Sequence, residues 1–87
     1  MTLTTDKTLQ FLIDNICADF TVASLLGTAR ACLAKGPCTF GDIAAAIKKK
    51  DASLDQHCAD GLAEGVADAL ADYGEATVRD GTVYPAG

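Results

Sequence analysis

Apolar residues recur at helical spacing along most of the chain and mark out four amphipathic segments. The first segment lies within residues 1–20, with apolar residues at Leu9, Leu12, Ile13, Ile16 and Phe20. The second is equally periodic, with apolar residues at Val22, Leu25, Leu26, Ala29, Cys32 and Leu33. The two sets are out of phase, so a break near residues 19–21 and two separate helices are predicted. Gly36 and Pro37 end the second helix, because glycine has low helix propensity and proline lacks a backbone donor.

Capping patterns open the third and fourth segments. Thr39-Phe40-Gly41-Asp42 resembles a capping box, and apolar residues follow it at Ile43, Ala44 and Ile47. Ser53-Leu54-Asp55-Gln56 predicts a second capping box, which opens the longest helix over residues 54–73. The apolar face of that helix contains Leu54, Cys58, Leu62, Val66, Leu70 and Tyr73. Gly61 and Gly65 lie on the same side, and they predict close approach of another helix because each costs about 1 kcal/mol relative to alanine.

The C-terminal residues have the pattern of a β-hairpin. Residues 76–79 and 82–84 flank Asp80-Gly81, which supplies the positive φ angles of a type I′ turn. Gly74 is expected to end the preceding helix in the left-handed conformation. The predicted fold class is therefore mainly α, with four helices plus a C-terminal β-hairpin. With 87 residues, the chain is expected to form a single domain, 1–87, because two cores of half that size would each be too small.

Negative charge is concentrated in one part of the chain. Twelve acids face seven bases overall, yet the segment 51–75 holds seven acids and no lysine or arginine. Four of these acids recur every fourth residue and form what we call the acidic row: Asp60, Glu64, Asp68 and Asp72. This spacing stacks them on one helical face, opposite the apolar one. The row is predicted to be exposed, where it either serves solubility or binds a partner.

The four cysteines are spaced irregularly. Cys17, Cys32, Cys38 and Cys58 have fourteen, five and nineteen residues between successive members, without the C-x-x-C pairs of structural zinc sites. Free thiols in a reducing compartment are expected. Cys38, beside Pro37, is predicted to lie in a loop and to be the most exposed thiol.

Catalytic and targeting signals are missing from the sequence. One histidine, no recognisable Ser-His-Asp arrangement and no glycine-rich phosphate loop argue against an enzyme, and no cofactor or metal is expected. His57 and Asp60 lie one helical turn apart, as a metal pair would, but a surface role is the expectation. The early apolar run Phe11-Leu12-Ile13 is too short for a signal peptide or a membrane span, which predicts a cytoplasmic protein.

The order of these elements resembles a winged helix-turn-helix over residues 21–85. The resemblance is carried by a helix ending at a glycine, the short helix opened by Thr39-Phe40-Gly41-Asp42-Ile43, the helix ending Ala69-Leu70-Ala71-Asp72-Tyr73-Gly74, and the hairpin around Arg79-Asp80-Gly81-Thr82-Val83-Tyr84. It implies that residues 1–20 form an extra helix, which either packs on the core or pairs two copies into a homodimer. It also implies that the helix 54–73 would enter a DNA major groove beside a basic wing. The residues that match this DNA-binding role are Lys48, Lys49, Lys50, Gln56 and Arg79.

The charge of the longest helix departs from that family pattern, because Asp55 and Asp60 at its start would meet the phosphates. The first functional hypothesis is therefore a protein-interaction module or inhibitor whose acidic row docks on a basic partner; a protein whose groove normally holds nucleic acid is one such partner. The carboxylates recur at about 6 Å, comparable with phosphates along a strand. Such imitation is a known strategy of small phage-encoded inhibitors, including some anti-CRISPR proteins, although no motif assigns this chain to them. The alternative is a dimeric transcriptional regulator that binds DNA.

Overall fold

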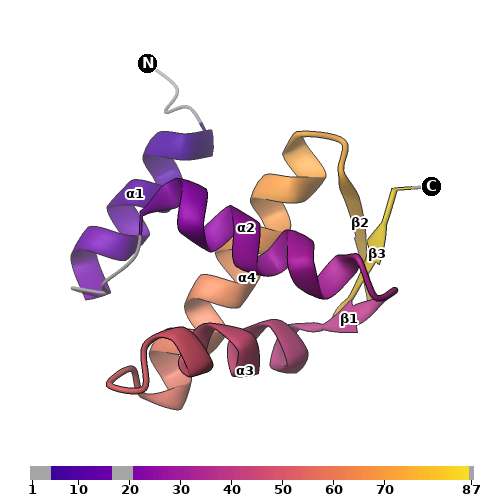
Figure 1. Ribbon diagram of the computed structural model, residues 1–87. Coiled ribbons are helices and arrows are strands. Elements are labelled where there is room, and N and C mark those ends of the chain that lie inside the picture. Colours follow the sequence, from indigo (N-terminus) through magenta and orange to yellow (C-terminus); the bar gives the residue numbers. More distant parts are fainter. Residues whose placement is uncertain (1–4, 17–20, 87) are drawn as a thin grey trace.

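The computed structural model describes residues 5–16 and 21–86, which form four helices and three strands (Figure 1). The elements are α1 (Thr5–Ile16), α2 (Val22–Leu33), β1 (Cys38–Thr39), α3 (Phe40–Lys50), α4 (Gln56–Asp72), β2 (Ala76–Arg79) and β3 (Thr82–Pro85). The prediction of a mainly α fold with a C-terminal hairpin is confirmed. The longest helix is shorter than predicted at both ends, and Cys17 and Phe20 lie outside the described residues.

Helix α4 is the element against which the other three helices pack. Figure 1 shows α2 crossing over α4, with α1 on one side of it and α3 on the other. Leu62, Val66 and Leu70 of α4 are completely buried, and so are three of its alanines. Because alanine side chains are short, neighbouring helices can lie close to the α4 backbone.

The two predicted capping boxes have different outcomes. The Thr39 box is confirmed: its hydroxyl oxygen accepts from the Asp42 N–H at 3.1 Å, and the Asp42 carboxylate accepts from the Thr39 N–H at 3.0 Å. The Ser53 box is wrong, because Asp55 caps α4 and accepts from the Cys58 N–H at 2.8 Å. Ser53 instead donates to Asp51, and Leu54, which lies between Ser53 and Asp55, is buried before the helix begins.

The sheet contains one strand that the sequence pattern did not indicate. Strand β1 pairs antiparallel with β3, Cys38 opposite Val83, and the strand order is β1-β3-β2. The prediction that Cys38 lies in an exposed loop is therefore wrong: pairing with β3 leaves it only 9% exposed. In the β2–β3 turn, Asp80 has φ 51° and Gly81 has φ 77°, as predicted.

Helix α4 ends as predicted at Gly74, whose φ is +76°. The N–H of Gly74 donates to the carbonyl of Ala71 at 3.1 Å, and that of Glu75 donates to the carbonyl of Leu70 at 2.8 Å. These two hydrogen bonds form a Schellman motif, in which two carbonyl groups at the helix end have partners. Tyr73 was predicted on the apolar face but is 42% exposed, because it follows the last helical residue.

Helix α1 packs on the core through Leu9 and Ile13, which are buried. A Cβ placed on Gly65 would lie 2.6 Å from Leu12 Cδ1, so the absence of a side chain at Gly65 permits this approach. The prediction of close helix approach is thus confirmed at Gly65. It is wrong at Gly61, where a Cβ would meet nothing within 4 Å.

Candidate functional site

The acidic row lies on the outer face of α4, and all four of its side chains are exposed. This orientation follows from burial of the opposite face, where Leu62, Val66 and Leu70 contact the other helices. The helix is continuous from Gln56 to Asp72, so the predicted four-residue repeat is preserved as one line of carboxylates.

The other three acids of the segment 51–75 have structural partners. Asp55 caps α4, and its pKa is lowered because the Cys58 backbone N–H donates to it. Asp51 accepts hydrogen bonds from Ser53. Glu75 also has a partner, Arg30, so three of the seven acids interact within the chain in this way, and the other four form the row.

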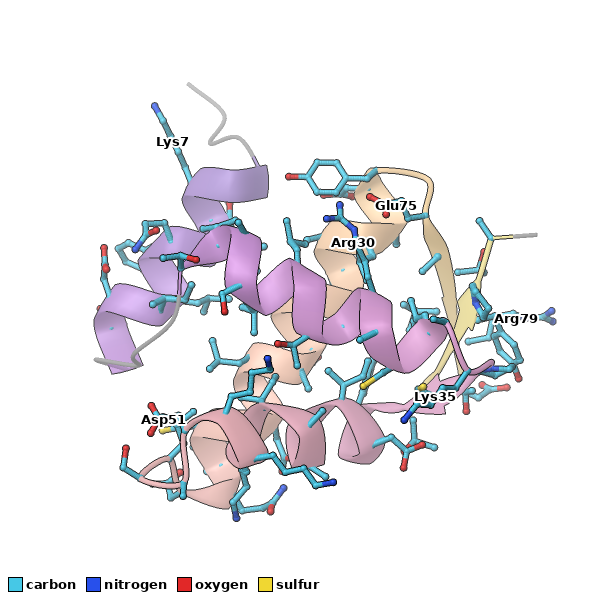
Figure 2. All side chains as sticks on the ribbon, viewed as in Figure 1. Lys7, Arg30, Lys35, Asp51, Glu75 and Arg79 are labelled. Carbon is cyan, nitrogen blue, oxygen red and sulfur yellow. The ribbon has the colours of Figure 1, made fainter. Side chains whose placement is uncertain are left out.

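Glu75, the last acid of the segment, forms an ion pair with Arg30 of α2. The guanidinium donates to both carboxylate oxygens, Nε to Oε1 at 2.8 Å and Nη2 to Oε2 at 2.7 Å. These hydrogen bonds lower the pKa of Glu75. Figure 2 shows the two side chains meeting where α4 ends, so this pair ties α2 to the end of α4.

The acidic row differs in environment along its length. Its first member, Asp60, accepts from Gln56 Nε2 at 2.7 Å, and Gln56 Oε1 accepts from Lys48 Nζ at 3.3 Å. Farther along, neither Glu64 nor Asp68 forms an ion pair within residues 5–16 and 21–86. The middle of the row is thus the part that leaves carboxylates open to an external cation.

The second half of the row borders α1. A cavity of about 210 Å³ between α1 and α4 is lined by Thr8, Leu9, Leu12, Gly65, Asp68, Ala69 and Asp72. The spacing of the acids does not indicate that α1 borders this surface. The available signal was Gly65, whose missing side chain allows Leu12 to lie beside the row.

The residues proposed for DNA binding are only partly brought together. Lys48 and Gln56 are in contact, whereas Lys49 and Lys50 line a cavity between α2 and α3. Arg79 is exposed on the hairpin. Figure 2 shows Arg79 on the opposite side of the molecule from Asp51, which immediately follows the three lysines. The set therefore does not form one basic patch.

Neither a metal centre nor a membrane span is evident in the part of the chain that the structure describes. Within those residues, no three His, Cys, Asp or Glu side chains are grouped so as to hold a metal ion. No described helix has both the length and the apolar character needed to cross a membrane. Comparisons with protein-family models, with curated proteins and with solved structures found no match to this chain.

Proposed function

We propose that the protein is a small interaction module or inhibitor that docks the acidic row of α4 on a basic protein surface. The observation that carries this proposal is the division of the seven acids. Asp51, Asp55 and Glu75 have partners within the chain, whereas Glu64 and Asp68, in the middle of the row, form no ion pair among the described residues. The row presents its charges on a rigid helix, which keeps their spacing fixed.

That spacing indicates the kind of partner. Carboxylates four residues apart on a helix recur at about 6 Å, comparable with the phosphates of a nucleic-acid strand. A groove that normally holds nucleic acid would present basic side chains with a matching repeat. Long-range attraction would accelerate the encounter, while desolvation and side-chain ordering would limit the affinity gained.

The test compares two variants with the same change in net charge. The first replaces two row residues, Glu64→Gln with Asp68→Asn. The matched control replaces two exposed acids outside the row, Asp14→Asn with Asp80→Asn. Asparagine is suitable at position 80 because it tolerates the positive φ there. Proteins captured from a cell extract by the wild-type protein are purified and titrated with each variant.

The proposal predicts that the row variant binds the purified partner several-fold more weakly, while the control binds like wild type. It also predicts that an oligonucleotide competes for the same partner, and that added salt weakens binding. Equal affinity of the two variants would exclude the row as the contact.

The second candidate function is a dimeric winged-helix transcriptional regulator that binds DNA. The order α2-β1-α3-α4-β2-β3 supports the winged-helix resemblance. The hydrogen bond from Lys48 of α3 to Gln56, the first residue of α4, is a second supporting observation. Against this role, the Gln56 amide already donates to Asp60. The test is a gel shift with genomic fragments at low salt, where phosphate attraction is strongest. Absence of retardation there would reject DNA binding.

A homodimer through α1 is a further part of this proposal. Phe11 of α1 is 62% exposed, and an exposed aromatic side chain of this size is common at interfaces. Sedimentation of the wild-type protein, of Phe11→Ser and of the control Tyr84→Ser tests it. The dimer should be lost only in Phe11→Ser, and a dimer that persists in that variant would place the contact elsewhere. We also infer a cytoplasmic location, because Cys32, Cys38 and Cys58 are free thiols, as is usual in a reducing compartment.

A further inference from the structure

Two cysteines are in contact where α2 leads into the sheet. The Cys38 thiol on β1 donates to the carbonyl oxygen of Cys32 on α2 at 3.1 Å, and also lies 3.4 Å from the carbonyl oxygen of Gly36. Cys38 is buried, whereas Cys32 is half-buried. The side chain of one cysteine therefore already touches the main chain of the other.

Both cysteines open onto a groove between α2 and α3. A cavity of about 320 Å³ is lined by Cys32, Cys38, Lys35, Lys49, Asp42 and two alanines. A neighbouring cavity of about 290 Å³ between the same helices shares Cys32, Lys35 and Lys49 and adds Lys50. Figure 2 shows Lys35 at the end of α2, close to the start of α3. The groove thus combines two thiols with three lysines.

The environments of the two thiols assign them different roles. The pKa of Cys38 is raised by its burial first and then by Cys32 and Asp42, while Lys35 acts in the opposite direction. Thiolate is the nucleophilic form, and access decides which thiol meets a reagent first. Cys32 is the more accessible of the two and lies in the groove that the lysines border, so it is the thiol that reacts first.

We propose that Cys32 and Cys38 form a thiol–disulfide exchange site for small disulfides that carry carboxylates, which the groove lysines attract. In the first step, the Cys32 thiolate attacks one sulfur of the small disulfide, a mixed disulfide forms and one small thiolate leaves. In the second step, the Cys38 thiolate attacks the Cys32 sulfur, the Cys32–Cys38 disulfide forms and the second small thiolate leaves. Two protein thiols are oxidised, the small disulfide is reduced to two thiols, and the two protons pass to the solvent and the leaving thiolates.

Mass spectrometry after reaction with oxidised glutathione tests the order of these steps. The wild-type protein should lose 2 Da, about the mass of two hydrogens. Trypsin should then release residues 31–35 joined to residues 36–48, and dithiothreitol should separate them. Cys38→Ser should stop after the first step, with one glutathione attached to Cys32. Cys32→Ser should give neither product, whereas Cys17→Ser and Cys58→Ser should behave like wild type.

A second measurement tests the role of the lysines. Lys35→Gln and Lys49→Gln should each slow the reaction with oxidised glutathione about fivefold at low ionic strength, and leave the reaction with uncharged hydroxyethyl disulfide unchanged. Lys48→Gln is the matched control, because Lys48 lines neither cavity and contacts Gln56 instead.

Three results would overturn the proposal. These are a disulfide that involves Cys17 or Cys58, a mixed disulfide that forms equally well in Cys32→Ser, or full retention of free thiols after the folded wild-type protein has been treated with oxidised glutathione. Equal effects of the lysine variants on the charged and the uncharged disulfide would overturn the assigned ligand class.

Discussion

Alanine substitution at the two central glycines of α4 tests how α1 docks on this helix. Both glycines lie inside the same helix, so each replacement gains about 1 kcal/mol of helix propensity. Only the tertiary surroundings differ. At Gly61 a Cβ would meet nothing within 4 Å, whereas at Gly65 it would lie 2.6 Å from Leu12 Cδ1 and 3.8 Å from Leu9 Cδ2.

The sizes of the two effects follow from these distances. Carbon atoms in favourable contact are about 3.5–4.0 Å apart, so the Leu12 methyl must move by roughly 1 Å to admit a Cβ at Gly65. Overpacking of this kind costs about 1–3 kcal/mol. We therefore expect Gly61→Ala to raise the free energy of unfolding by about 1 kcal/mol. Gly65→Ala should leave it unchanged or lower it by up to about 2 kcal/mol.

Urea unfolding of both variants, followed by circular dichroism, gives the comparison. Leu12→Ala in each background then provides a double-mutant cycle, because this truncation removes the methyl that clashes with position 65. The variant with both Leu12→Ala and Gly65→Ala should be more stable than the sum of the two single effects predicts, by about 1 kcal/mol or more. For Leu12→Ala with Gly61→Ala, the two effects should simply add. If Gly65→Ala were as stabilising as Gly61→Ala, the close approach of α1 to α4 would be refuted.

Three further predictions concern the ends of α4. Asp55→Ala should destabilise the fold at pH 7, whereas Asp55→Asn should retain the cap. Because the pKa of Asp55 is lowered in the folded state, the carboxylate contributes its full stabilisation above its ordinary pKa and loses it as the pH falls through the lowered pKa. Urea unfolding between pH 7 and pH 3 measures this loss. Glu75→Gln should remove the ion pair with Arg30 and lower the urea midpoint, and the stabilisation by this pair should likewise be lost as the pH falls, because the pKa of Glu75 is lowered. If the double variant with Arg30→Gln lost the full sum of both single effects, the two side chains would not be coupled. Gly74→Ala should cost roughly 1–2 kcal/mol because φ is +76°, and an unchanged urea midpoint would contradict the Schellman ending.

The features predicted correctly from the sequence depend on a few neighbouring residues. The Thr39 cap, the Asp80-Gly81 turn and the ending at Gly74 each need only local chemistry, and the structure has all three. The exposure of the acidic row also follows from local periodicity. Strand β1 could not be predicted in this way, because its two residues become a strand only by pairing with β3, far along the chain.

The choice of cap for α4 shows where local chemistry is ambiguous. Ser53 and Asp55 both offer a side-chain oxygen, and the burial of Leu54 between them favours a helix that begins later, at Gln56. The contacts around the candidate site are likewise tertiary. Neither the Lys48–Gln56–Asp60 chain nor the border formed by α1 is encoded in the spacing of the acids themselves.

The acidic row lowers the stability of the helix that carries it, and this bears on its role. Its three like-charged pairs at four-residue spacing cost about 1 kcal/mol together. Asp72 adds negative charge at the C-terminal end of α4, where the helix dipole favours a cation and the last turn contains no basic residue. Acids placed only for solubility could be scattered without these costs. A variant with Asp60→Asn, Glu64→Gln, Asp68→Asn and Asp72→Asn should therefore be about 1 kcal/mol more stable by urea unfolding, while losing its affinity for a basic partner. A variant that lost stability instead would show that the row supports the fold, and the docking proposal would lose its physical basis.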